Sequence, residues 1–178
     1  VILVSGPTNL QEPTVHKLIN VKGAEEMLEA VIQNLPVDVF ISTAAVCDWK
    51  LQAFDIKNNK IDSDKKIKKN LFNKGNLIFK IKENPDILKL VSYHKLRPKL
   101  VVGFAAETDN LTKNAKLKLK NKKLDLIVAN KITNNNIVFG MDVNSVNIID
   151  KDTQEEYINK SKVEVAKIII KKVLKNLI

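Results

Sequence analysis

The sequence predicts an α/β fold: a Rossmann-like, mostly parallel sheet flanked by helices, with a strand-and-loop flap protruding at about residues 49–83. Two observations favour this class. Apolar runs alternate along the chain with helical patterns, and two of them, 37–46 and 100–106, end in small residues next to a carboxylate. Such alternation is typical of parallel strands joined by helical crossovers. Because ligand sites border the carboxyl ends of such strands, we expect a small-molecule site where these two runs end.

Apolar runs place the strands. The run at 1–5 has the character of a buried strand and is stopped by Gly6 and Pro7. The segment 77–82 alternates apolar and polar residues, which is typical of an edge or hairpin strand. The run at 145–150 is expected to pair with the residues around it. Further strands are expected at 16–21, 37–42, 100–104 and 124–129.

Periodic apolar positions place the helices. Five apolar residues share one face of 23–35, and Pro36 stops that helix. Another helix is expected to begin at Asn84, which can cap it, followed by Pro85 in the first position and by Asp86, whose charge complements the positive helix end. Two more helices are expected at 111–123 and 161–178.

The remaining long segment, 51–76, has no sustained period and contains the lysine-rich run 65–69. We expect a mobile, charged loop there. The length of the chain predicts one domain over residues 1–178 that can bury a sizeable core. Since the chain opens within an apolar run and without methionine, we expect a domain truncated at its amino-terminal end.

The net charge of +10 comes almost entirely from lysine, because Arg97 is the only arginine. Proteins that read nucleic acids favour arginine for bidentate contacts and aromatic side chains for stacking. Here aromatic residues make up only 5% of the chain. The composition therefore indicates a solvated lysine surface and no nucleic-acid partner.

Cysteine usage and hydropathy bear on the compartment. Cys47 is the single cysteine, which excludes an intrachain disulfide and a multi-cysteine zinc site. We interpret it as a small packing residue rather than a catalytic thiol. No apolar run reaches the ~20 residues needed to cross a bilayer, and the first residues do not resemble a signal peptide. A cytoplasmic location without membrane contact is expected.

Several familiar catalytic motifs are missing from the sequence. It contains no GxxxxGK[ST] phosphate loop, no GxGxxG and no HExxH. The only histidines are His16 and His94, so a hydrolase triad is not favoured. The missing GxGxxG also argues against a nicotinamide or flavin oxidoreductase.

A series of short segments, taken together, is more specific than any one of them. The segments are VSGP (4–7), AAVCDW (44–49), KKIKK (65–69), ENPDIL (83–88), VGFAAET (102–108), the pair Lys118 and Lys122, DLIVAN (125–130) and FGMDVNSV (139–146). Their order and spacing resemble the phosphopantothenoylcysteine synthetases, which form the synthetase part of the bacterial bifunctional coenzyme A biosynthesis flavoprotein.

The resemblance implies a phosphopantothenate–cysteine ligase. In that family the enzyme joins 4′-phosphopantothenate to cysteine through an acyl-cytidylate, with CTP as co-substrate in the bacterial type and with Mg²⁺. Members are dimeric, so a homodimer is implied, with the flap as the exchange surface. No FMN is expected on this chain, because the flavin-binding half has no counterpart in it. The metal ligands are not assigned.

The residues carried over by the resemblance suit these roles. Small side chains at Ala44 and Ala45 leave peptide groups open to a base edge, whereas Asp48 suits ribose hydroxyls, a hydrated cation or a turn cap. Lys66 resembles the family lysine that closes over the triphosphate and neutralises charge on the leaving pyrophosphate. Residues 85–88 place free helix-start N–H groups at the nucleotide.

Three further residues complete the assignment. Phe104 would be an apolar wall beside the nucleotide, and Lys118 and Lys122, four residues apart on a helix, can face one anion. The implied nucleotide-binding set is Ala44, Ala45, Asp48, Lys66, Pro85, Asp86, Ile87, Leu88, Phe104, Lys118 and Lys122, with Lys66 also catalytic.

One alternative function remains open at this point. Family members have a strand, a glycine-rich turn and a helix ahead of the VSGP segment, and the sequence has no counterpart of them. Glu83 also stands where bacterial members usually have lysine. The alternative is that the chain is a truncated or split remnant, which binds nucleotide or a partner chain and has no activity alone.

Overall fold

The computed structural model describes residues 1–61, 77–131 and 143–177. Its centre is a five-stranded sheet in the order β3-β6-β7-β8-β9. The strands β3 (Val39–Ser42), β6 (Leu100–Glu107) and β7 (Leu126–Lys131) run parallel, and β8 (Val143–Asp150) and β9 (Gln154–Ser161) add antiparallel pairs at one side. The predicted α/β class is confirmed.

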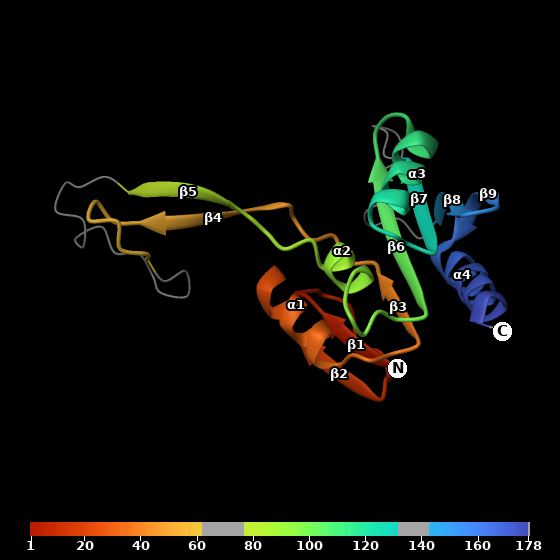
Figure 1. Ribbon diagram of the computed structural model, residues 1–178, viewed down its shortest axis with the longest axis horizontal. Coiled ribbons are helices and arrows are strands. Elements are labelled where there is room, and N and C mark those ends of the chain that lie inside the picture. Colours follow the sequence, from red (N-terminus) through yellow and green to blue (C-terminus); the bar gives the residue numbers. More distant parts are fainter. Residues whose placement is uncertain (62–76, 132–142, 178) are drawn as a thin grey trace.

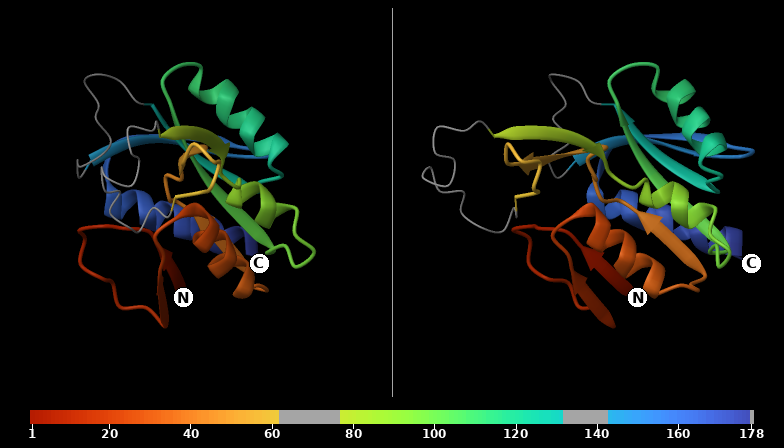
Figure 2. Two further views of the ribbon diagram at one scale, coloured as in Figure 1. Left: turned by 90° about the vertical axis from the view of Figure 1, so that its left-hand side faces the viewer. Right: turned by 60° about the vertical axis from the view of Figure 1, so that its left-hand side comes forward.

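Two helices cover opposite faces of this sheet, α3 (Leu111–Asn121) one face and α4 (Lys162–Leu177) the other (Figure 2). Successive side chains of a strand point to opposite faces. Val102 of β6 therefore belongs to the core cluster beneath α4, and its neighbour Val101 belongs to the cluster beneath α3; both are fully buried. Burial on both faces is the reason that β6 reads as a continuous apolar run.

A second parallel pair, β1 (Ile2–Ser5) with β2 (Lys17–Asn20), lies beside α1 (Ala24–Gln33) (Figure 1). A third apolar cluster joins α1 to α2 (Ile87–Ser92) and includes the fully buried Val91. This cluster also receives a side chain of β3. It therefore fixes the short helix α2 against the edge strand of the main sheet.

The strands β4 (Trp49–Phe54) and β5 (Ile78–Glu83) form an antiparallel hairpin that projects away from the rest of the protein (Figure 1). The hairpin is the flap expected from the sequence. The loop expected at 51–76 is wrong for residues 51–54, which belong to β4, and residues 62–76 lie outside the described residues. The alternation of apolar and polar residues begins at Trp49, ahead of position 51, and pairing with β5 supplies the hydrogen bonds.

Other boundaries differ from expectation by a few residues. The helix expected at Asn84 begins at Ile87, with Asp86 as its cap. The polar, partly exposed sequence of β9 gives little sign of a strand, and its pairing with β8 establishes it. None of the described helices is long and apolar enough to cross a membrane.

Candidate functional site: a crevice at the strand ends

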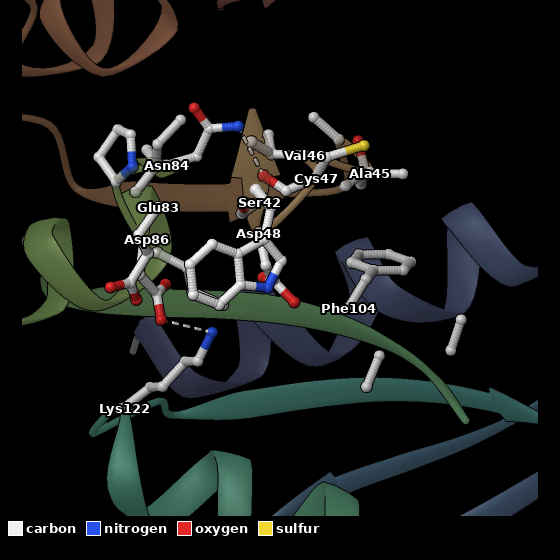
Figure 3. A pocket seen from close by; sticks show the side chains of 18 of the residues that line it. Ser42, Ala45, Val46, Cys47, Asp48, Glu83, Asn84, Asp86, Phe104 and Lys122 are labelled. Carbon is white, nitrogen blue, oxygen red and sulfur yellow. Dashed lines mark hydrogen bonds and ion pairs between the residues drawn. The ribbon is translucent and has the colours of Figure 1, made fainter. Parts of the chain in front are cut away.

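A cavity of about 500 Å³ lies at the carboxyl ends of β3, β6 and β7 (Figure 3). Its position is the one where open α/β sheets bind ligands, and its volume falls in the range of small-molecule sites. All but two of the residues assigned to nucleotide binding line it. They are Ala44, Ala45, Asp48, Pro85, Asp86, Ile87, Leu88, Phe104 and Lys122.

The segment 42–49, which continues β3, forms one wall of the cavity. Ala44 and Ala45 are exposed there, so their peptide groups are accessible to a ligand. The carboxylate of Asp48 makes no hydrogen bond or ion pair with any residue that the structure describes. Cys47 lies on the same wall and is exposed, so its interpretation as a packing residue is wrong.

The opposite wall is the start of α2. Asp86 accepts a hydrogen bond from the backbone N–H of Lys89 at 3.1 Å through Oδ1, and its Oδ2 lies 2.8 Å from Nζ of Lys122 (Figure 3). One carboxylate thus caps the helix and holds a lysine at the cavity. The expected cap, Asn84, does not serve this helix, because its side chain is turned to Cys47.

Close packing against β6 sets the depth of this second wall. A Cβ added at Gly103 would lie 2.7 Å from Cδ2 of Leu88 and 2.8 Å from Cδ1 of Leu124. Both separations are far below a van der Waals contact. A glycine at this position therefore lets Leu88 seat directly against the strand.

The floor of the cavity is formed by strand ends. Phe104 of β6 supplies an apolar surface, and Asn130 of β7 supplies a carboxamide in a residue only 9% exposed. Asn130 pairs with Ala106 in the β6–β7 register, so it lies level with the end of β6. Asn130 follows the strand predicted at 124–129 and belongs to the DLIVAN segment, but it is not among the predicted site residues. The polar residue that closes the apolar run 124–129 is the signal that could have placed it there.

Lys118 and Lys122 do not face a common group. Nζ of Lys118 lies 2.6 Å from Oε1 of Glu107, whereas Lys122 pairs with Asp86 at the cavity. Lys118 is absent from the cavity lining. The expectation that both lysines face one anion is not met among the described residues, and a nucleotide contact by Lys118 stays a prediction.

Glu107, at the end of β6, also accepts a hydrogen bond from Nδ2 of Asn114 at 3.0 Å. Burial opposes ionisation of this carboxyl, but the hydrogen bonds from Lys118 and Asn114 outweigh it and hold the pKa of Glu107 below its ordinary value of 4.5. These contacts tie the end of β6 to α3.

Because the folded pKa of Glu107 is lowered, its contribution to stability is fully present above pH 4.5 and is lost as the pH falls through the folded value. We expect Glu107→Gln to lower the free energy of unfolding by about 1 kcal/mol near neutral pH, with the deficit shrinking in acid. Urea unfolding at a series of pH values measures it. The matched control is Glu156→Gln, which changes an exposed carboxylate on β9. A deficit that stays constant in acid contradicts the assignment.

Lys66, the residue assigned to catalysis, lies outside the described residues. Among the charged side chains that line the cavity, three are acidic (Asp48, Glu83 and Asp86) and one, Lys122, is basic. Because carboxylates outnumber lysine in this part of the lining, an anion can bind there only together with additional positive charge.

Comparison with known proteins places this chain in a family. The family model described as "DNA/pantothenate metabolism flavoprotein C-terminal domain" matches residues 1–177. The chain is 38% identical over 173 residues to the coenzyme A biosynthesis bifunctional protein CoaBC of Borreliella burgdorferi, covering 96% of the chain and 41% of that protein. It is 34% identical to the CoaBC protein of Haemophilus influenzae, covering 98% of the chain and 41% of that protein.

Among solved structures, the C-terminal domain of a CoaBC protein matches with a TM-score of 0.70 and 35% identity, covering 97% of this chain and 71% of that one. The chain thus spans about 41% of the length of the two curated relatives. The matches extend over nearly the whole chain and confirm the resemblance seen in the sequence. The chain belongs to the family of DNA/pantothenate metabolism flavoprotein C-terminal domains.

Proposed function

We propose that this chain is the phosphopantothenate–cysteine ligase part of coenzyme A biosynthesis and uses CTP. The observation that carries the proposal is the coincidence of two features. The chain matches the C-terminal domain of a CoaBC protein along 97% of its length, and nine of the eleven residues that the family resemblance assigns to the nucleotide line the crevice. We further propose that the synthetase domain spans residues 1–178 with the flap at about 49–83.

The proposed reaction has two steps. A carboxylate oxygen of 4′-phosphopantothenate attacks the α-phosphorus of CTP, a new P–O bond forms, and pyrophosphate leaves. The amine of cysteine then attacks the acyl carbon, loses a proton, and CMP leaves with the oxygen that bound phosphorus. The protein contributes mainly by holding the reactants in line and stabilising the charge that develops.

The residues of the crevice divide these tasks. Peptide groups at Ala44 and Ala45 contact the base, and the carboxamide of Asn130 offers it a further hydrogen bond from the floor. Phe104 forms the apolar wall beside the nucleotide. Lys122 contacts a phosphate group of the nucleotide. Because Nζ of Lys122 already lies 2.8 Å from Oδ2 of Asp86, the phosphate and Asp86 share this lysine.

The donor set of the crevice fits Mg²⁺ as a companion of the nucleotide. Magnesium is usually held by one or two carboxylates together with substrate phosphates and water. No cluster of three or more metal-binding side chains occurs among the described residues, so a cage made by protein alone is not offered. Asp48, unpaired within the described residues and on the cavity wall, would hold the ion. When bound, Mg²⁺ neutralises phosphate charge in a lining with three carboxylates and one lysine.

We also propose that the chain forms a homodimer through the hairpin. Its strand register puts Leu51 opposite Ile81 and places Phe79 and Trp49 on the same face, and all four are more than half exposed. A two-stranded hairpin with an uncovered apolar face is marginal in water, so a second copy that covers this face stabilises it. Symmetric pairs are the commonest way for a chain to provide such a cover.

Charge on this face tests the dimer. We expect the double variant Leu51→Lys with Ile81→Lys to sediment as a monomer under conditions where the unchanged chain sediments as a dimer. Gln52→Lys, on the opposite face of the same strand, is the control and is expected to remain dimeric. An unchanged chain that sediments as a monomer at high protein concentration contradicts the proposal.

We propose a cytoplasmic location, which suits a free and exposed Cys47. The assay that tests the ligase function supplies the chain with CTP, Mg²⁺, 4′-phosphopantothenate and cysteine. The proposal expects CMP and phosphopantothenoylcysteine in equal amounts. CTP binding without CMP, with turnover restored by a separately made segment homologous to the preceding part of the relatives, supports the alternative of a split protein. A chain that neither binds CTP nor forms CMP contradicts both the ligase proposal and the split-protein alternative.

A further inference from the structure

Asn84 joins the two walls of the crevice. Its side-chain Nδ2 donates to the carbonyl oxygen of Cys47 at 2.9 Å (Figure 3). Its backbone N–H donates to the carbonyl oxygen of Asp48 at 2.7 Å. The two hydrogen bonds connect segments that are 36 and 37 positions apart in the chain. One residue therefore fastens the wall that continues β3 to the wall that begins α2.

The same contacts close the root of the hairpin. Trp49 and Glu83 are the last register pair of β4 and β5, and Asn84 adds the next hydrogen bond toward the body of the protein. The direction in which the hairpin leaves the crevice thus depends on Asn84. A rotation at this point would move the whole hairpin relative to the sheet.

The side chain of Asn84 is not needed for the helix that follows. Asp86 accepts the hydrogen bond from the N–H of Lys89 that a cap residue provides. Asn84 also borders a second cavity of about 1230 Å³, which lies between the same wall and the β1–β2 pair. The two hydrogen bonds of Asn84 to Cys47 and Asp48, here called the clamp, therefore lie between the two cavities. Their loss would loosen the wall that the two cavities share.

We propose that Asn84 is a positioning residue, which holds the Ala44–Asp48 wall and the Pro85–Leu88 wall at a fixed separation. This inference rests on the proposed function, because it assigns the effect of the clamp to nucleotide binding. The side-chain amide acts through its hydrogen bond to the backbone of Cys47. Asn84 thereby sets the distance between Asp48 on one wall and the Asp86–Lys122 pair on the other.

The chain contains its own reporter for this clamp. Trp49, the only tryptophan, follows Asp48 directly and lines the crevice. We expect Asn84→Ala and Asn84→Asp to give faster depolarisation of Trp49 fluorescence in the ligand-free protein, since Ala removes the amide and Asp keeps its size but not its donor. Both variants are expected to bind Mg²⁺–CTP about fivefold more weakly in calorimetry and to raise the KM for CTP more than they lower kcat.

The matched control is Asn34→Ala. Nδ2 of Asn34 donates to the backbone oxygen of Ala30 at 2.7 Å, the same kind of bond, at the end of α1 and outside both cavities. It is expected to change thermal stability without changing Trp49 depolarisation or CTP affinity. A role for Asn84 in folding alone would give the same pattern as the control.

The outcomes separate the clamp from the proposed function. If the unchanged chain binds CTP, unchanged affinity or unchanged Trp49 depolarisation in both Asn84 variants overturns the inference. If the unchanged chain binds no CTP, the proposed function fails, and the clamp is tested by Trp49 fluorescence alone. Faster depolarisation in the Asn84 variants then supports the clamp, and unchanged depolarisation overturns it.

Discussion

Replacing Lys66 by glutamine is expected to lower kcat for CMP formation by about 100-fold to 1,000-fold, the loss typical for removal of one charge-stabilising group. The physical reason is charge: pyrophosphate leaves with more negative charge than it carried in CTP, and the described lining supplies only Lys122 as a cation. The ligase assay measures the effect. Affinity for CTP is expected to fall much less, because the charge to be neutralised grows during the step.

A neighbouring charge provides the control for this prediction. Lys65→Gln removes the same charge from the adjacent position and is expected to keep kcat within about threefold, because the resemblance assigns the catalytic role to Lys66 and not to Lys65. Both variants are expected to unfold at the same temperature as the unchanged chain. A Lys66→Gln variant whose stability falls in parallel with its turnover contradicts the catalytic assignment.

Replacing Ala45 by leucine is expected to weaken CTP binding by about 100-fold, because the larger side chain occupies the cavity and keeps the ligand from the peptide groups of that wall. Ala45 is exposed, so the protein does not have to accommodate leucine in its core. The free energy of unfolding is therefore expected to change by less than about 0.5 kcal/mol. Calorimetry with Mg²⁺–CTP and urea unfolding measure the two quantities.

Ala166→Leu is the matched control, since Ala166 is an exposed alanine of α4 that does not line the crevice. It adds the same side chain away from the crevice and is expected to leave CTP affinity unchanged. Equal affinities for the Ala45→Leu and Ala166→Leu variants would exclude this wall from the nucleotide site.

The sheet was predictable because burial leaves a simple trace in sequence. β6 and β7 are covered on both faces, so their apolar runs are continuous, and the position of the crevice followed from where those runs end. The hairpin was harder to predict. Its apolar face is exposed, so Trp49 and Leu51 carry the same signal as residues of an irregular loop until the partner strand is known.

Contacts between distant segments could not be predicted from the sequence. Asn84 precedes a helix, and local rules favour a cap there, whereas its partner Cys47 is 37 positions away. Lys118 and Lys122 share a helix face by spacing, but their carboxylate partners, Glu107 and Asp86, come from different elements and draw them apart. Local patterns specify which residues belong to a helix or strand, and tertiary partners decide where polar side chains point.

The central claim is that the crevice at the ends of β3, β6 and β7 binds a cytidine nucleotide. Titration calorimetry of the chain with Mg²⁺–CTP, run beside the Ala45→Leu variant, tests it most directly. We predict saturable binding of one CTP per chain that is lost in the variant. Absence of heat with well-folded protein, or binding of equal strength in the variant, would contradict the claim.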